Sequence, residues 1–276
     1  MIKYVILLLV SLSLNAKESE DLFFKDKNAH ANGFGIHIDL GYSSYLIELD
    51  SSELNSAIDY DVLEFTLGST YSYEKWMFGI YGKFLIKELN SNMFVVTTQQ
   101  KLGDYAHIDK EEFGLYTNYT LAQYQDAVWR VNFIYRYSGL EANDSYKDFY
   151  FYQSNFNYET QGVALSLVYV QSLSDKSSWF TQAGLLYSKA KVKMSESVNT
   201  YLQDTFVDDE AQALGGKFSL GYSYELTKEL FLTLRMDAWK LKFGELTVIS
   251  RVGDILPSAK LKEHSFTTYT GLSWRF

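Results

Sequence analysis

The stretch WRVNFIYRYS at residues 129–138 places an apolar or aromatic side chain at almost every second position. One row holds Trp129, Val131, Phe133, Tyr135 and Tyr137, and the other holds Arg130, Asn132, Arg136 and Ser138. Successive side chains of a β-strand point to opposite faces. The pattern therefore predicts a strand with one apolar and one polar face.

The same period of two recurs along most of the chain. Further rows begin at Phe34, Leu63, Trp76, Phe113, Val163, Trp179, Phe218, Leu230 and Phe266. These segments are longer than ordinary strands, and about ten strands fit the chain at roughly 26 residues per strand and connection. Aromatic side chains near the segment ends, such as Tyr73, Trp129 and Trp274, are expected to form girdles at the two membrane interfaces.

The connections between these segments alternate in length. Short links are expected near residues 73–75, 122–127, 173–177 and 227–228. Longer polar segments lie near residues 48–57, 88–108, 140–158, 194–213 and 244–263. Short turns on one side and long loops on the other are typical of an outer-membrane barrel, in which strands can also continue outside the bilayer.

We therefore expect an all-β fold, a closed antiparallel transmembrane β-barrel of about ten strands with short periplasmic turns and long extracellular loops. Closure is needed because lipid cannot satisfy the backbone N–H and C=O groups of an open sheet edge. A secreted β-sandwich is the alternative, since its strands also alternate. It would not account for the long segments and the alternating connections together.

The end of the chain supports the barrel. The last residues are Tyr269-Thr270-Gly271-Leu272-Ser273-Trp274-Arg275-Phe276. They resemble the terminal signal of bacterial outer-membrane barrels, in which a Tyr or polar residue, a Gly, alternating aromatics and a final Phe are read by the assembly machinery. The resemblance covers these residues alone and implies Tyr269, Gly271, Trp274 and Phe276 as the signal. It also implies the barrel-assembly machinery and periplasmic chaperones as partners.

The N-terminus has the pattern of a cleaved secretory signal peptide. Met1-Ile2-Lys3 is a short positive start, and the apolar run at residues 4–14 is followed by Ala16. That run is shorter than the roughly 20 apolar residues of a membrane-spanning helix. The expected parts are a signal peptide at 1–16, a periplasmic segment at 17–32 and a barrel at 33–276. The expected location is the bacterial outer membrane.

Composition narrows the function classes. The sequence has 25 Lys and Arg against 34 Asp and Glu, a net charge of −9, so a nucleic-acid partner is not expected. It has no cysteine, so disulfides and thiolate metal sites are excluded. The acidic groups Asp208-Asp209-Glu210 and Asp59-Tyr60-Asp61 would bind Ca²⁺ only loosely. We expect no dedicated metal site and no cofactor, and we expect outer-membrane lipids, lipopolysaccharide and small solutes as contacts.

The polar rows supply charges that the pattern places inside the barrel. They are Asp39, Glu64, Lys83, Lys87, Glu112, Arg130, Arg136, Lys217, Glu225, Arg235, Asp237 and Arg275. Both signs are present, and unpaired charges in a narrow lumen are costly. The sequence therefore predicts an interior plugged by ion pairs and hydrogen bonds rather than a wide channel.

In size and strand count the chain resembles the omptin proteases, which are ten-stranded barrels with a site at the extracellular rim. That family pairs two aspartates after the third strand with an Asp–His couple after the seventh. Here the loop after the third predicted strand offers Asp104, His107 and Asp109. The loop after the seventh offers Asp204 and Asp208-Asp209-Glu210 but no histidine, so the resemblance is one of architecture only.

Two function hypotheses of different classes follow. The first is a non-enzymatic small or partly plugged pore for ions or small solutes. The second is a structural or adhesin-like barrel that binds partners through its long loops. A rim protease or a lipid-modifying enzyme is less expected, because none of His30, His37, His107 and His264 lies in a recognisable nucleophile–base motif.

Overall fold

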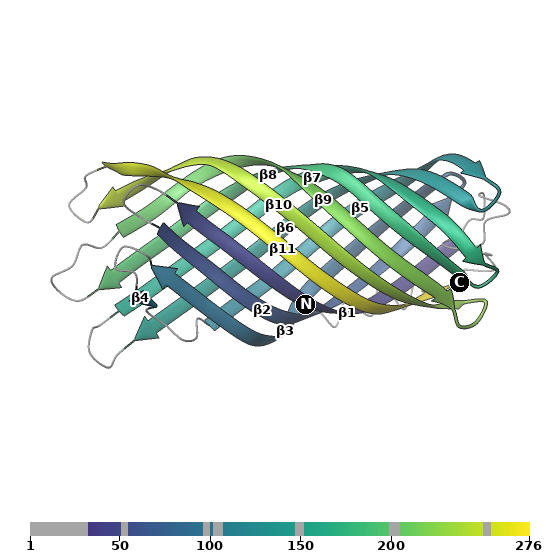
Figure 1. Cartoon of the computed structure of the whole chain (residues 1–276), viewed down its shortest axis with the longest axis horizontal. Helices are drawn as coiled ribbons and strands as arrows, with labels where there is room; N and C mark the ends of the chain where they lie inside the picture. The colour runs from purple at the N-terminus through teal and green to yellow at the C-terminus, as the bar shows by residue number, and fades with distance from the viewer. Residues whose placement is uncertain are drawn as a thin grey trace.

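The computed structural model describes residues 33–50, 55–95, 100–101, 107–146, 152–198, 205–250 and 255–276. The expected signal peptide and periplasmic segment, at 1–32, lie outside the described residues. Nearly every described residue is in a β-strand (Figure 1). Among these residues, no helix is long and apolar enough to cross a membrane.

Ten long strands and one short strand follow each other along the chain. They are β1 (Gly33–Asp50), β2 (Asn55–Tyr73), β3 (Trp76–Val95), β4 (Gln100–Lys101), β5 (His107–Tyr124), β6 (Ala127–Tyr146), β7 (Tyr152–Ser174), β8 (Ser177–Val198), β9 (Thr205–Glu225), β10 (Leu230–Ser250) and β11 (Ile255–Arg275). The expectation of about ten strands is confirmed.

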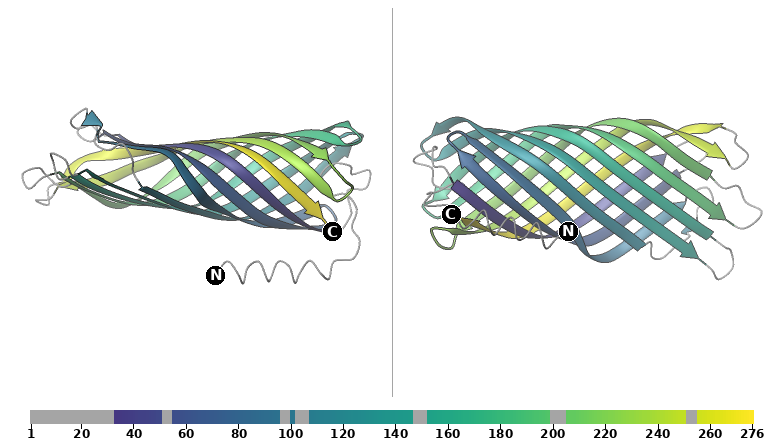
Figure 2. Two further views of the ribbon diagram at one scale, coloured as in Figure 1. Left: turned by 90° about the horizontal axis from the view of Figure 1, so that it is seen from below. Right: turned by 180° about the vertical axis from the view of Figure 1, so that it is seen from behind.

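The ten long strands form one closed antiparallel barrel. Each pairs with its neighbour in sequence, β3 with β5 across the short β4, and β1 with β11 closes the sheet. The strands are inclined to the long axis of the molecule, as a closed barrel requires (Figures 1 and 2). The barrel is flattened, since it is broader in Figure 1 than in the left panel of Figure 2.

The two ends of the barrel differ, and we call them the turn end and the loop end. At the turn end, Glu74–Lys75, Gln125–Asp126 and Asp175–Lys176 connect strands directly, and the chain ends beside the first strand through a hydrogen bond from Phe276 N to Phe34 O (2.9 Å). At the loop end, strands continue through most of each long polar segment. For example, β1 runs to Asp50 and β2 begins at Asn55. In an outer-membrane barrel the turn end is the periplasmic one.

Apolar and aromatic side chains cover the outside of the barrel near the turn end. On β6, Trp129, Phe133 and Tyr135 are 36%, 44% and 41% exposed. Neighbouring strands link their rings, with centroids 4.6 Å apart for Trp76 and Tyr119 and 4.7 Å apart for Trp129 and Tyr169. This belt is the expected lipid-facing surface with its aromatic girdle.

The two faces exchange polarity toward the loop end. On β1, outward Leu40 and Tyr42 give way to Glu48 and Asp50. The inward face changes in the opposite sense, from Asp39 near the turn end to Tyr45, Ile47 and Leu49 near the loop end. The prediction that inward residues are polar is therefore wrong for the loop-end half, because there water, rather than lipid, surrounds the strands.

Strand length explains this exchange. β6 has 20 residues, which is about 65 Å of extended chain and, at a tilt of about 40°, roughly 50 Å along the axis. The apolar band of an outer-membrane barrel is only about 25 Å tall. About half of each strand thus extends beyond the membrane.

The inward placement of Lys87 is also wrong. The register between β2 and β3 shifts between the pairs Leu63↔Lys87 and Glu64↔Leu85, and Lys87 is exposed. A single extra residue in one strand moves the following side chains to the other face. Simple alternation misses this reversal.

Replacing Phe133 with Arg is expected to destabilise the barrel by about 2–4 kcal/mol, because Phe133 stands at the centre of the β6 apolar row. The measurement is urea unfolding of protein folded into lipid vesicles. The matched control is Asn155→Arg on the exposed outer face of β7 near the loop end, which should fold like the wild type. Equal losses in both variants would contradict the position of the belt.

Candidate functional site

The interior of the barrel is divided into three tiers along its axis. On β1, Gly35, His37 and Asp39 line a cavity near the turn end. Ser43 belongs to a charged cluster above it, and Tyr45 begins an apolar core that continues to Leu49. The same order is found on β10, where Arg235 and Asp237 line the cavity and Leu241, Phe243 and Val248 belong to the core.

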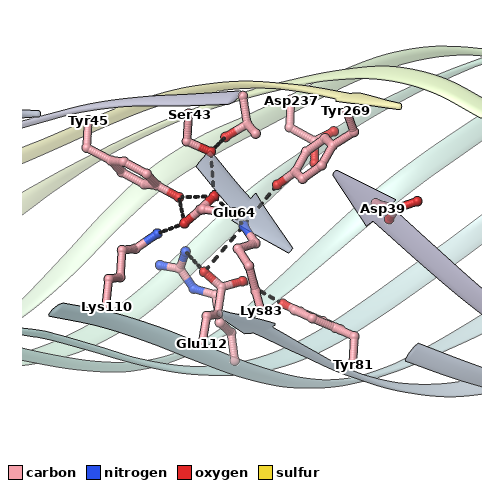
Figure 3. Close-up of polar contacts among 12 residues, drawn as sticks. Asp39, Ser43, Tyr45, Glu64, Tyr81, Lys83, Lys110, Glu112, Asp237 and Tyr269 are labelled. Carbon is pink, nitrogen blue, oxygen red and sulfur yellow. Dashed lines mark hydrogen bonds and ion pairs between the residues drawn. The ribbon is translucent and has the colours of Figure 1, made fainter. Parts of the chain in front are cut away.

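The charged cluster contains Glu64, Lys83, Lys110, Glu112 and Arg136, all of them at most 7% exposed (Figure 3). Lys110 Nζ lies 2.7 Å from one oxygen of Glu64, and Lys83 Nζ lies 3.8 Å from both Glu64 and Glu112. Arg136 completes the chain of ion pairs at 3.7 Å from Glu112. Alternating signs keep these buried charges close to partners, as a low-dielectric interior requires.

Hydroxyl groups and aromatic rings satisfy the remaining sides of the cluster. Ser43 and Tyr45 donate hydrogen bonds to Glu64, and Tyr81 donates one to Glu112 at 2.9 Å (Figure 3). The Lys110 ammonium lies 3.6 Å from the centre of the Tyr45 ring. Such contacts with ring faces stabilise a desolvated cation.

Several contacts cross the barrel from one wall to the other. Lys83 on β3 donates to Tyr269 on β11 at 2.9 Å, and the Arg136 guanidinium on β6 lies 3.4 Å from the Trp239 ring on β10. Higher up, Tyr158 on β7 donates to Glu263 on β11 at 2.6 Å. The flattened cross-section allows these contacts, which fix the distance between the walls.

The apolar core fills the loop-end half of the interior. It is built from side chains all round the barrel, among them Val62, Ala142, Val192, Leu241 and Leu261, each with an exposure of 0%. Tyr45 and Tyr60 stack inside it with ring centroids 4.9 Å apart. The side chains of this tier are as deeply buried as those in the core of a water-soluble protein.

The cavity occupies the turn-end half and has a volume of about 270 Å³. Arg235 spans one side of it, 3.8 Å from Asp39 and 3.4 Å from Asp237. A Cβ at Gly271 would collide with the Asp39 carboxylate, so glycine is needed at this place.

The structure places the predicted inward charges as follows. Asp39, Lys83, Glu112, Arg130, Arg136, Lys217, Arg235 and Asp237 line the cavity, and Glu64 lies in the charged cluster. Of the C-terminal residues, Tyr269 is buried and Gly271 faces Asp39, whereas Phe276 is 39% exposed on the outside. Trp274 pairs with Ile36 of β1.

Sequence reasoning missed Lys110, Tyr158 and Glu263. Lys110 shares the parity of Glu112, so the alternation could have placed it inside, but its run of charged neighbours resembles a loop. Tyr158 and Glu263 are bonded partners from distant strands, and no local pattern relates them.

The rim residues are not gathered into one site among the described residues. His107 is largely exposed and lies 4.0 Å from Glu88. Asp109 stands opposite Glu141 of β6 in the strand register. Asp104 and Asp204 lie outside the described residues. No group of three His, Asp or Glu that could hold a metal ion occurs in the described ranges.

Removing one partner of the Glu64–Lys110 pair is expected to lower the free energy of unfolding by about 3–5 kcal/mol, because a buried charge is left alone. The variants are Glu64→Gln, Lys110→Met and their combination, and the double variant should recover much of the loss. Urea unfolding followed by Trp fluorescence measures this.

The control for this cycle is the exposed Lys189–Glu210 pair on β8 and β9. Lys189→Met should cost less than about 1 kcal/mol, since water screens exposed ion pairs. Small and equal losses in all four variants would mean that the cluster does not hold the walls together.

Comparison with known proteins agrees with this architecture. The profile of the OmpA-like transmembrane domain matches residues 86–276. No curated protein sequence matches the chain. Among solved structures, the outer membrane protease OmpT from Escherichia coli superposes with a TM-score of 0.63 at 12% identity, covering 93% of this chain and 99% of that one.

The translocator domain of the autotransporter NalP from Neisseria meningitidis gives a TM-score of 0.49 at 11% identity, over 100% of this chain and 95% of that one. At such identities the OmpT likeness shows the fold alone. The profile match covers more than half of the sequence. The chain therefore belongs to the OmpA-like transmembrane domain family and is an integral β-barrel of the bacterial outer membrane.

Proposed function

We propose that the protein is a non-conducting, non-enzymatic barrel that acts through the surface its strands present outside the bilayer. The observation that carries this proposal is the apolar core in the loop-end half of the interior. An ion crossing the barrel would have to leave water and pass through that core, which is prohibitively costly for an isolated charge. The core therefore favours the surface role over the small pore.

The outer face of the same half supports a surface role. It carries exposed ion pairs, Lys193–Asp208 at 3.9 Å and Lys262–Asp50 at 3.4 Å, in place of the apolar belt. These side chains stand on paired strands rather than on free loops. A rigid polar surface of this kind suits contacts with a charged partner outside the cell, because little order is lost on binding.

The rim offers little support for catalysis. A general base must lie within hydrogen-bond reach of the group it activates. His107 has Glu88 as its neighbour, and Glu88 already accepts hydrogen bonds from Ser91 and from the backbone of Ile108. This arrangement fits a role for Glu88 in holding the ends of β3 and β5 together.

Single-channel recording in a planar bilayer tests the closed interior. The folded wild type is expected to be electrically silent. The triple variant Val192→Gly, Leu241→Gly, Leu261→Gly removes three fully buried core side chains and should create discrete conductance. The matched control changes the exposed residue before each of them, as Lys191→Gly, Lys240→Gly, Lys260→Gly, and should stay silent. Steady conductance in the wild type would establish the pore instead.

Labelling of single cysteines tests the exposed half, since the natural chain has no cysteine. Asp208→Cys near the loop end should react with a membrane-impermeant maleimide on intact cells. Lys176→Cys, in a turn-end connection, should react only after the outer membrane is permeabilised. The opposite pattern would invert the orientation and overturn the proposal.

A further inference from the structure

We infer that the cavity in the turn-end half is a binding site for a small amphipathic anion, such as a carboxylate with an apolar body, that enters from the periplasmic side. The inference does not depend on the surface role proposed above. It rests on the charge of the cavity wall, on the separation of polar and apolar surfaces within it, and on its position at the turn end.

The lining of the cavity carries a surplus of positive charge. Its cationic side chains are Lys83, Arg130, Arg136, Lys217, Arg235 and Arg275, and its carboxylates are Asp39, Glu112 and Asp237. The whole chain, by contrast, has a net charge of −9. A protein rich in acidic groups thus concentrates positive charge in one enclosed space, which raises the local concentration of anions.

Lys217 is the cation best placed to receive such an anion. The two nearby carboxylates, Asp39 and Asp237, both lie within ion-pair distance of Arg235. Lys217 takes part in none of the ion pairs found among the described residues, although it lines the cavity. Trp239 of β10 stands opposite Lys217 of β9 in the strand register. Its buried indole N–H also has no hydrogen-bond acceptor among the described residues.

The wall beside Lys217 is mostly apolar. Lys217 stands opposite Gly184 of β8, and the cavity surface beside it includes Gln182, Phe180 and Leu186 of β8 and Val168 of β7. A side chain at Gly184 is excluded, because a Cβ there would collide with the hydroxyl oxygen of Ser166. A ligand with a charged head and an apolar body would match both surfaces at once.

The cavity reaches the turn end of the strands. Its lining includes Gly35 and Arg275, which pair with each other next to the end of the chain. The connections between the described strands at this end have two or four residues and are too short to fold across the mouth of a barrel, and the apolar core closes the opposite side. The volume of about 270 Å³ is near the lower end of the range of about 300–1,000 Å³ for ligand pockets, which points to a small ligand.

Equilibrium dialysis with radiolabelled benzoate tests the site, using the full folded protein in an uncharged detergent and empty micelles as the blank. Benzoate should bind in a saturable manner. Benzyl alcohol, its neutral analogue, and acetate, which lacks the apolar ring, should each bind about tenfold more weakly. Benzyl alcohol has no charge to pair with the cations of the cavity, and acetate has no ring to contact the apolar wall. Equal binding of benzoate and benzyl alcohol would overturn the inference, and this comparison needs no variant.

Two variants locate the binding within the cavity. Lys217→Met keeps the length of the side chain without its charge and should weaken benzoate binding about tenfold. Val168→Thr keeps the shape of the apolar wall but adds a hydroxyl group, and should weaken it to a smaller extent. The control is Lys240→Met, an exposed lysine on the outer face of β10. Unchanged affinity in Lys217→Met, with its heat-dependent gel shift intact, would also overturn the inference.

Discussion

The pairing of β1 with β11 is the constraint on which the rest of the structure depends. The ladder runs from Gly35↔Arg275 to Asp50↔Lys260 and closes the sheet without an edge. A strand surrounded by lipid has no other source of partners for its backbone N–H and C=O groups. Closure fixes one inward face for every strand, and the cross-wall contacts of Lys83 and Arg136 then hold that face in a flattened shape.

The strands are about twice as long as the membrane requires, so one sheet meets two solvents. Inside the bilayer the hydrophobic effect favours apolar residues outward, and polar groups gather inside, where they must pair. Outside the bilayer the strands are surrounded by water, so the apolar residues face inward, as in a water-soluble protein. The cluster around Glu64 and Lys110 lies at the boundary between these regimes, next to the apolar ring of Tyr45.

The sequence alone was sufficient for the closed barrel, its ten long strands and its lipid-facing rows, because alternation with a period of two is a local property. The row from Trp129 to Tyr137 on β6 is an example of such a lipid-facing row. It was insufficient for Lys87, whose face depends on a bulge, and for the Tyr158–Glu263 bond, whose partners meet only after closure. Burial in the loop-end half was also missed, since its charged outer residues resemble those of loops.

The three tiers make the two ends of the barrel unequal. The apolar core fills the loop-end half, and the lining of the cavity reaches Gly35 and Arg275 near the turn end. The anion site that we infer would therefore be reached from the periplasm and not through the core. Ion pairs such as Glu64–Lys110 lie between that core and the cavity. We thus propose a barrel that is closed toward the extracellular side, with a rigid polar surface on the outside and a positively charged recess on the inside.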